Sequence, residues 1–482
     1  MNPCLDSDGY GESCGLFGVF GVPEAASVIF QGLFSLQHRG QEGVGIVTSD
    51  GSRIRSVKRL GLVGEIDTTT FREELSGHLG IGHVRYSTTG STRMHNVQPL
   101  VVECVDGIWA VAHNGNLVNA DRLRSMYQQA GAIFQTSTDS EVLIHLLADP
   151  MYRQRPGRVG RALGELRGAF SFLLMTKDCI MAARDPFGFR PLSMGKLGDG
   201  FVFASETCAL RQVGAEFVRD LKPAELVKVD AGGVHSSSFA ERQGHLAQCI
   251  FELVYFARPD SAVFGKNAHH VRLQYGMRLA EEHPVQADVV ISVPDSGNSA
   301  ALGFSRKSGI PLDYGFIRNH YIGRTFIMPG TEQRKQGVDM KLAVLPEVVR
   351  NKRVVVVDDS IVRGTTVRRR VGCLRTAGAK EVHVRISCPP ISFPCFYGID
   401  FPTKEELVAA NHDTERIRHF LEADSLGYLS VQGLLSPFEN PLDFCTACFT
   451  GKYCMDPSRT QGKHDWEKYS PSVDDGAGNL PT

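Results

Sequence analysis

The sequence predicts two domains of different class: an α+β domain in which two sheets carry helices on their outer sides, followed by a doubly wound α/β domain. First, a chain of 482 residues exceeds what one hydrophobic core usually serves. Second, strand patterns, then helix patterns, then further strand patterns fill the chain up to about Val234. Third, a strand-loop-helix pattern recurs beyond the linker-like stretch 236–244. We therefore divide the chain into a leader (1–13), two domains (14–240 and 241–455) and a flexible polar tail (456–482).

Composition limits the classes of function. Hydrophobic residues make up 42% and charged residues 22%, with a net charge of −1, as in an ordinary globular protein. Such a charge balance argues against a nucleic-acid binder, and no apolar run is long enough to span a membrane. The polar, acidic N-terminus fits neither a secretory signal nor a transit peptide, so we expect a cytoplasmic protein. Its twelve cysteines should then be mostly reduced, and any that cluster suggest metal binding or catalysis.

The sequence of the first domain predicts short strands interrupted by three helices. Alternating or β-branched residues predict the strands 14–20, 44–48, 53–57, 79–86, 101–104 and 108–112. Helical patterns cover 25–36, 120–129 and 140–147. Polar segments follow two of the strands, Ser87 to Gly90 after one and His113 to Asn116 after the other. Strands, then helices, then further strands indicate two sheets with helices on their outer sides.

Cys14 is the candidate nucleophile of this domain. A lone cysteine at the start of an apolar strand is more often a small buried hydrophobic residue. Removal of the leader, however, would place the α-amino group of Cys14 beside its own thiol, and their ordinary pKa values of about 7.7–8.0 and 8.5 lie close together. Asn114 and Gly115 offer an amide and an unobstructed N–H to an oxyanion. Arg85 and Asp139 could hold the two charges of a free amino acid.

Five motifs in this domain resemble those of class II, N-terminal-nucleophile glutamine amidotransferases. They are Cys14-Gly-Leu-Phe-Gly, Leu36-Gln-His-Arg-Gly-Gln-Glu, Gly82-His-Val-Arg-Tyr-Ser-Thr, Ala112-His-Asn-Gly-Asn-Leu and Thr138-Asp-Ser-Glu. The resemblance implies a four-layer αββα fold and a removed propeptide, residues 1–13. It implies that Cys14 is the nucleophile and that Asn114 and Gly115 form the oxyanion hole. The glutamine-binding residues would be Arg39, Gly40, Arg85, Thr88 and Asp139.

The second domain is organised around the stretch from Arg353 to Thr366. Four valines, 354–357, predict a strand buried on both faces, and Asp358 and Asp359 stand at its end. Ser360, Gly364, Thr365 and Thr366 follow, before a helix pattern. Because ligands of open α/β sheets bind at the carboxyl ends of strands, this stretch predicts a site for a phosphorylated, hydroxyl-rich ligand. An acidic helix cap is the simpler alternative, and no P-loop accompanies it to support an NTPase.

A second strand-loop-helix unit supports the phosphate-site interpretation. A helix at 271–282 and a strand at 287–294 precede the small-residue loop 295–299, and a further strand is predicted at 381–387. The acidic stretch resembles the phosphoribosylpyrophosphate loop of type I phosphoribosyltransferases. There, the resemblance implies, Asp358 and Asp359 hold the ribose hydroxyls and Ser360, Gly364, Thr365 and Thr366 cradle the 5′-phosphate. Mg²⁺ would be held through Ser296, Asp358 and Asp359.

Taken together, residues 14–453 resemble the amidotransferases that use phosphoribosylpyrophosphate. The expected reaction converts glutamine, phosphoribosylpyrophosphate and water into 5-phosphoribosylamine, glutamate and pyrophosphate at the start of purine synthesis. In this family a basic segment orders over the substrate, and Arg324 and Lys341 would contact the pyrophosphate. His320 stands where the family usually has Arg. The resemblance also implies feedback inhibition by purine nucleotides and a homo-oligomer, commonly a tetramer.

Four cysteines of the second domain match the iron–sulfur ligands of one branch of that family. They are Cys249, Cys395, Cys445 and Cys448. A single C-x-x-C pair could equally serve zinc or redox chemistry. The resemblance favours a [4Fe–4S] cluster with four thiolate ligands and a structural role.

Two alternative functions each share only one of the two domains with the expected enzyme. Glucosamine-6-phosphate synthase shares the first domain but lacks the Asp358-Asp-Ser-Ile-Val-Arg-Gly-Thr-Thr loop. A regulatory protein that senses phosphoribosylpyrophosphate would keep that loop but would not need Cys14, Asn114 and Asp139.

Overall fold

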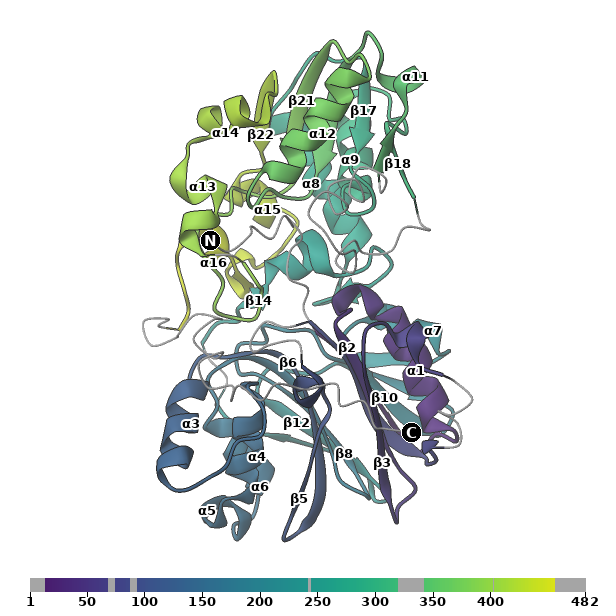
Figure 1. Cartoon of the computed structure of the whole chain (residues 1–482), viewed down its shortest axis with the longest axis vertical. Coiled ribbons are helices and arrows are strands. Elements are labelled where there is room, and N and C mark those ends of the chain that lie inside the picture. Colours follow the sequence, from purple (N-terminus) through teal and green to yellow (C-terminus); the bar gives the residue numbers. More distant parts are fainter. Residues whose placement is uncertain are drawn as a thin grey trace, which may run out of the picture. The chain divides into compact units, whose positions relative to one another are not determined.

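The computed structural model describes residues 14–67, 74–86, 93–241, 244–319, 342–401 and 403–455. The chain forms two compact units, which are described separately (Figure 1). The N-terminal unit runs to Gly244 and also includes the short segment Phe396–Ile399 and Met455. The C-terminal unit begins at His245 and contains the chain on both sides of that segment.

Two antiparallel sheets form the centre of the N-terminal unit. The first has the strand order β11 (Glu216–Asp220), β9 (Ser193–Leu197), β10 (Gly200–Ala204), β1 (Gly15–Phe20), β4 (Leu79–Arg85), β2 (Gly43–Ser49) and β3 (Ile54–Leu60). The second has the order β13 (Gly233–Ser238), β12 (Glu225–Asp230), β8 (Ile180–Arg184), β7 (Gly168–Met175), β6 (Gly107–Leu117) and β5 (Leu100–Cys104). Their inner faces share one core, to which Leu16, Ile81, Ala110 and Leu173 contribute without exposure to solvent.

Helices cover the outer faces of both sheets (Figure 1). The helices α1 (Ala25–Ser35) and α7 (Thr207–Gln212) share a buried cluster with the first sheet, which contains Phe17 and Ile29. On the second sheet lie α3 (Ala120–Gln129), α4 (Glu141–Ala148), α5 (Pro150–Arg153) and α6 (Arg158–Gly164). Their core includes Phe170 and Phe172. The four layers confirm the αββα expectation.

The predicted strand ending at Ala112 is longer than expected. β6 continues to Leu117 because β7 pairs with it along its whole length, with Asn114 opposite Ser171 and Gly115 opposite Phe170. The polar residues that were expected in a loop after the strand therefore lie within it. Ladder pairing holds their backbone more rigidly than a loop would.

The C-terminal unit contains a parallel sheet of four strands, β17 (Val289–Ser292), β20 (Arg353–Asp358), β21 (Glu381–Ile386) and β22 (Ser425–Tyr428). Leu312 adds a single parallel bridge to Val290. Val290 also pairs with Val355 of β20. The chain segment that follows β17 thus lies on the side of β17 away from β20, which is the strand order 2-1-3-4-5 of a doubly wound fold. In this order ligands bind at the switch point between the first and third strands, here β17 and β20.

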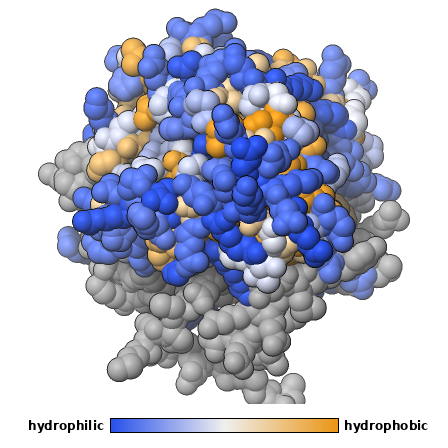
Figure 2. Space-filling view, turned by 90° about the horizontal axis from the view of Figure 1, so that it is seen from above, coloured by the Kyte–Doolittle hydropathy of each residue, from blue (hydrophilic) through white to orange (hydrophobic). Residues whose placement is uncertain are grey.

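The remaining elements of this unit are helices and short strand pairs. The helices are α8 (Ala268–Glu282), α9 (Asn298–Ser308), α11 (Pro346–Val349), α12 (Thr365–Thr376), α13 (Val408–Asn411), α14 (Thr414–Leu421), α15 (Val431–Leu435) and α16 (Ala447–Thr450), with a π-helical turn at Glu252–Phe256. The pairs are β14 (Gln248–Cys249) with β23 (Phe444–Cys445), β15 (Ala262–Val263) with β16 (Lys266–Asn267), and β18 (Phe316–Arg318) with β19 (Leu342–Val344). No described helix is long and apolar enough to cross a membrane. Seen from above, hydrophilic side chains cover most of the coloured surface (Figure 2).

Candidate active sites

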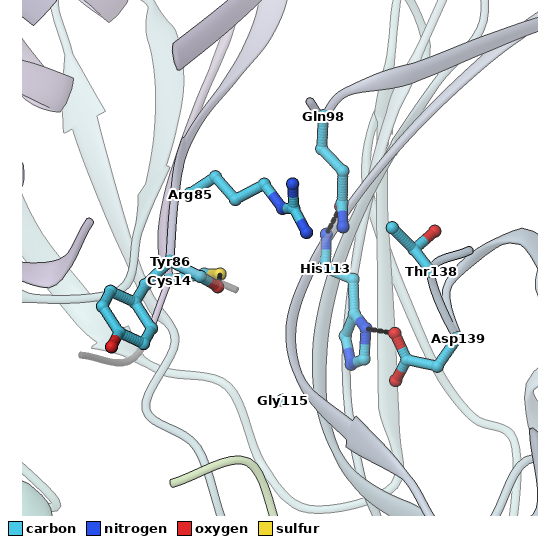
Figure 3. A pocket seen from close by; sticks show the side chains of 8 residues that line it. All are labelled: Cys14, Arg85, Tyr86, Gln98, His113, Gly115, Thr138 and Asp139. Carbon is cyan, nitrogen blue, oxygen red and sulfur yellow. Dashed lines mark hydrogen bonds and ion pairs between the residues drawn. The ribbon is translucent and has the colours of Figure 1, made fainter. Parts of the chain in front are cut away.

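A pocket in the N-terminal unit brings together four of the eight residues expected to bind or hydrolyse glutamine, Cys14, Arg85, Gly115 and Asp139, whereas Asn114, Arg39 and Gly40 do not line it. It is lined by Cys14, Arg85, Tyr86, Gln98, His113, Gly115, Thr138 and Asp139. Cys14 stands just before β1 and Arg85 ends β4, whereas His113 and Gly115 belong to β6 of the facing sheet. Figure 3 shows the Arg85 guanidinium reaching from the Cys14 side toward His113 and Gln98. The pocket thus combines a thiol, a cation and a carboxylate between the two sheets.

The thiol of Cys14 is protected from solvent. Its Sγ lies 3.3 Å from the backbone oxygen of Tyr86, and the side chain is 8% exposed. Burial raises the pKa of Cys14 above its ordinary value, and the Tyr86 carbonyl contact and the positive charge of Arg85 only partly offset this effect. The thiol therefore needs a base before it can attack a substrate.

Asp139 is buried but held as a carboxylate. Burial opposes its ionisation most strongly, yet contacts with His113, the N–H of Leu117 and the hydroxyl of Ser140 together lower its pKa. Its Oδ2 accepts from Leu117 N at 2.9 Å and its Oδ1 from Ser140 Oγ at 3.2 Å. The Nδ1 of His113 lies 3.6 Å from Oδ1 (Figure 3). An anion fixed in this way can receive a substrate ammonium group.

A polar network that was not predicted from the sequence positions Asp139. Gln98 accepts a hydrogen bond from the backbone N–H of His113 at 2.7 Å and donates to Ser140 Oγ at 3.1 Å. His113 Nδ1 lies 3.0 Å from the same Ser140 oxygen. These residues come from three separate segments, so their spacing in sequence gives no warning. The only signal was a histidine directly before the Asn114-Gly115 pair.

Arg39 and Gly40 lie behind the nucleophile. The guanidinium of Arg39, fully buried, donates from Nε to the backbone oxygen of Cys14 at 3.1 Å and from NH1 to Glu206 Oε1 at 2.5 Å. His38 Nε2 lies 2.7 Å from the same Glu206 oxygen. Gly40 packs against backbone, since an added Cβ would come within 2.6 Å of the Arg85 carbonyl carbon. Both residues thus support the walls of the pocket, and Thr88 lies outside the described residues.

The acidic pair of the C-terminal unit stands at the switch point between β17 and β20. Asp358 ends β20, and both carboxylates are 4% exposed. Ser296, from the loop between β17 and α9, donates its hydroxyl to Asp359 Oδ2 at 2.5 Å. Ser360 also bonds to Asp359. The structure thus joins the two loops that the sequence singled out separately.

Asp358 is paired with Arg370 of α12, whose NH1 lies 2.6 Å from Oδ2. Burial nevertheless raises the pKa of Asp358 to about 7, with Arg370 opposing and the neighbouring carboxylate of Asp359 adding to the rise. Gly364 caps the N-terminus of α12, whose first residues are Thr365 and Thr366. A helix start with hydroxyls suits a phosphate group. Arg324, Lys341 and His320 lie outside the described residues.

Four cysteines gather in another part of this unit. Cys249 and Cys445 are paired across β14 and β23, and Cys448 follows on α16. Burial raises the pKa values of Cys445 and Cys448 well above the ordinary value, and the other thiols of the group, Cys249 and Cys395 among them, add to the rise. Across the described ranges, no three His, Cys, Asp or Glu side chains are placed to hold one metal ion.

The fold and the two sites define a class of protein: an N-terminal-nucleophile glutamine amidotransferase joined to a phosphoribosyltransferase. A family model for the glutamine amidotransferase domain matches residues 83–212. The chain is 48% identical over 451 residues to an amidophosphoribosyltransferase from Bacillus subtilis (strain 168), covering 92% of this chain and 94% of that protein. It is 47% identical over 458 residues to one from Methanocaldococcus jannaschii, covering 91% and 97%. The chain belongs to the amidophosphoribosyltransferase family.

The solved structures agree with this assignment. The glutamine phosphoribosylpyrophosphate amidotransferase of B. subtilis, complexed with ADP and GMP, has a TM-score of 0.87 and 46% identity. That match covers 94% of this chain and 100% of the solved chain. A structure described as the allosteric regulatory enzyme of purine biosynthesis has a TM-score of 0.88, with 46% identity, and covers 94% and 99%. At this similarity both the fold and the enzyme class carry over.

Proposed function

We propose that this chain releases ammonia from glutamine at Cys14 and transfers it to phosphoribosylpyrophosphate, forming 5-phosphoribosylamine, glutamate and pyrophosphate. The observation that carries the proposal is the pocket in which Cys14 faces Arg85, Gly115 and Asp139. A glucosamine-6-phosphate synthase would not need the Ser296–Asp359 site. A regulatory protein that only senses phosphoribosylpyrophosphate would not need this pocket.

In the first half-reaction Arg85 and Asp139 hold the α-carboxylate and α-ammonium groups of glutamine. Removal of residues 1–13 frees the α-amine of Cys14, which takes the thiol proton and later gives it to the leaving ammonia. The sulfur attacks the amide carbon, and Asn114 and Gly115 stabilise the resulting oxyanion. Water then cleaves the thioester, releasing glutamate and restoring the thiol.

In the second half-reaction the carboxylates of Asp358 and Asp359 hold the ribose hydroxyls while the start of α12 receives the 5′-phosphate. Ammonia forms a bond to the anomeric carbon as the bond to pyrophosphate breaks, and Arg324 and Lys341 bind the leaving group. Mg²⁺ commonly uses one or two carboxylates plus substrate oxygens, so Ser296, Asp358 and Asp359 suit it. When bound, the ion would neutralise charge on the pyrophosphate.

The four gathered thiols support a [4Fe–4S] cluster held by Cys249, Cys395, Cys445 and Cys448. The thiols of Cys445 and Cys448, whose ionisation is opposed by burial and by the neighbouring thiols of Cys249 and Cys395, fit a cationic group that would stabilise the thiolates when bound. We assign the cluster a structural role, and expect the purified protein to be brown and to contain iron; colourless, zinc-bearing and active protein would contradict the assignment.

Regulation and assembly follow the family in this proposal. The B. subtilis structure was solved with ADP and GMP, which supports purine nucleotides as feedback inhibitors here. We further propose a cytoplasmic homotetramer that binds neither nucleic acid nor membrane.

The decisive experiment compares two ammonia sources. Cys14→Ala should abolish glutamine-dependent formation of 5-phosphoribosylamine and retain the ammonia-dependent reaction, because the two half-reactions use separate sites. Mass spectrometry of the active wild-type protein should find Cys14 at its N-terminus. Loss of both reactions in the variant, or an intact leader in fully active protein, would refute the corresponding part of the proposal.

A further inference from the structure

The segment Phe396–Ile399 packs with the N-terminal unit, although the chain on both sides of it belongs to the C-terminal unit. We call this segment the strap. Tyr397, Gly398 and Ile399 are all buried, with Tyr397 3% and Ile399 4% exposed. These four residues pack with the N-terminal unit although their neighbours in sequence belong to the C-terminal unit. This arrangement suggests that they have a specific function in the N-terminal unit.

The strap lies against the strand that carries the predicted oxyanion hole. An added Cβ on Gly398 would come within 2.8 Å of the carbonyl carbon and 3.1 Å of the Cα of Gly115. Gly398 has a φ of +92°, which also favours glycine. In Figure 3 a pale green ribbon, the colour of the chain near residue 400, passes close to Gly115. Backbone therefore packs on backbone at the residue expected to donate to the oxyanion.

Three polar contacts hold the strap in this position. Asn116, next to Gly115 on β6, donates from Nδ2 to the backbone oxygen of Phe396 at 3.0 Å. Arg190, fully buried, donates from NH2 to the backbone oxygen of Tyr397 at 2.8 Å. The Tyr397 hydroxyl lies 3.0 Å from both the N and the O of Met455. The Tyr397 ring packs on Phe189, with ring centroids 4.5 Å apart.

We propose that the strap is a positioning element for glutamine hydrolysis: Gly398 fixes the backbone of Gly115 so that its N–H points at the developing oxyanion. Donor placement within a few tenths of an ångström decides such stabilisation. Gly115 has a φ of +147°, and its strand pairing with Phe170 of β7 holds it along one edge of β6, while Gly398 packs against its carbonyl carbon and Cα. The inference rests on the oxyanion role proposed for Asn114 and Gly115.

Gly398→Ala tests the strap, with Gly131→Ala as its matched control. Gly131 lies in the same unit and has the same φ of +92°, but an added Cβ would meet nothing within 4 Å. Both variants therefore carry the same backbone strain, and only Gly398→Ala displaces Gly115. We expect the glutaminase kcat of Gly398→Ala to fall about 10²–10³-fold relative to the control, as when an oxyanion donor is lost. The KM for glutamine should change little, because Arg85 and Asp139 are untouched.

A second measurement distinguishes loss of oxyanion stabilisation from general damage to the site. Alkylation of Cys14 by iodoacetamide forms no oxyanion, so its rate should be the same in both variants. Ammonia-dependent synthesis should also be retained. If Gly398→Ala folds poorly, Asn116→Asp replaces the donor to Phe396 with an acceptor of the same size, and should lower kcat by the same route.

The outcomes distinguish the inference from the proposed function. Equal glutaminase kcat in Gly398→Ala and Gly131→Ala, or equal losses in kcat and in alkylation rate, would overturn the role of the strap. Wild-type protein without glutaminase activity would instead overturn the proposed function on which the inference rests.

Discussion

Glu206 lies under the nucleophile, and its replacement by Gln should damage both stability and glutamine hydrolysis. Its Oε1 receives Arg39 NH1 at 2.5 Å, and both side chains are fully buried. Arg39 in turn holds the backbone oxygen of Cys14 at 3.1 Å. Glu206→Gln keeps the shape and an acceptor oxygen but leaves the Arg39 charge without its counterion in a site that excludes water.

The magnitude follows from the burial. Removing one partner of a buried ion pair costs about 3–5 kcal/mol, and the retained amide oxygen places Glu206→Gln near 3 kcal/mol. For a unit of this size such a loss lowers Tm by roughly 6–12 °C. Because the Arg39 that holds Cys14 shifts, kcat for glutamine should fall on the order of tenfold or more.

The assay can be confined to the N-terminal unit. The chain has two tryptophans, so in a Trp466→Phe background the fluorescence of Trp109, on β6, reports urea unfolding of this unit alone. Asp178→Asn, in the same unit, is the control, because Asp178 is 64% exposed and its partner Lys177, 3.9 Å away, is 61% exposed. That pair should contribute no more than about 1 kcal/mol. Equal stabilities for the two variants, with unchanged glutaminase kcat, would refute the reasoning.

Three further predictions concern other sites. Asp139→Asn should lower kcat/KM for glutamine about 10–100-fold by removing the partner of the substrate ammonium, and leave ammonia-dependent synthesis intact; loss of both would contradict it. Asp359→Asn should raise KM for phosphoribosylpyrophosphate about 10–100-fold without affecting glutaminase measured in its absence, and an unchanged KM would refute the ribose contact. Burial lowers the pKa of His83 to about 3, below its unfolded value of about 6.5, so the folded protein binds fewer protons between these values. The contribution of neutral His83 to the free energy of unfolding is therefore complete above pH 6.5 and falls with pH, by about 2 kcal/mol at pH 5. Urea unfolding should show this loss in the wild-type protein relative to His83→Asn. The same difference in free energy between the two proteins at pH 7 and at pH 5 would exclude it.

The sequence predicted the layers well because periodicity reports burial directly. The valines of β20 and the alternating strands of the N-terminal unit were placed within a few residues of their observed ends. β6 was cut short at Ala112, because Asn114 to Asn116 are poor strand formers and only pairing with β7 keeps them extended.

The sites were predicted to the extent that their residues fall in compact motifs. Cys14, Arg85, Gly115 and Asp139 do converge on one pocket. Arg39 was expected to line the glutamine pocket. Its guanidinium donates to Glu206, which lies far away in the sequence, and this contact sets where the side chain points. The Gln98–His113–Ser140 network was invisible for the same reason: no local pattern encodes a contact between three segments.

The strap has a consequence for the order in which activity arises during synthesis. The ribosome completes residues 14–244 well before it reaches Phe396, so the newly made N-terminal unit lacks the support beneath Gly115 and the carbonyl partners of Asn116 and Arg190. We expect a fragment ending at Gly244 to fold yet hydrolyse glutamine poorly, which a glutaminase assay of that fragment can check. Glutamine would then be spared until the domain that consumes its ammonia has also been made.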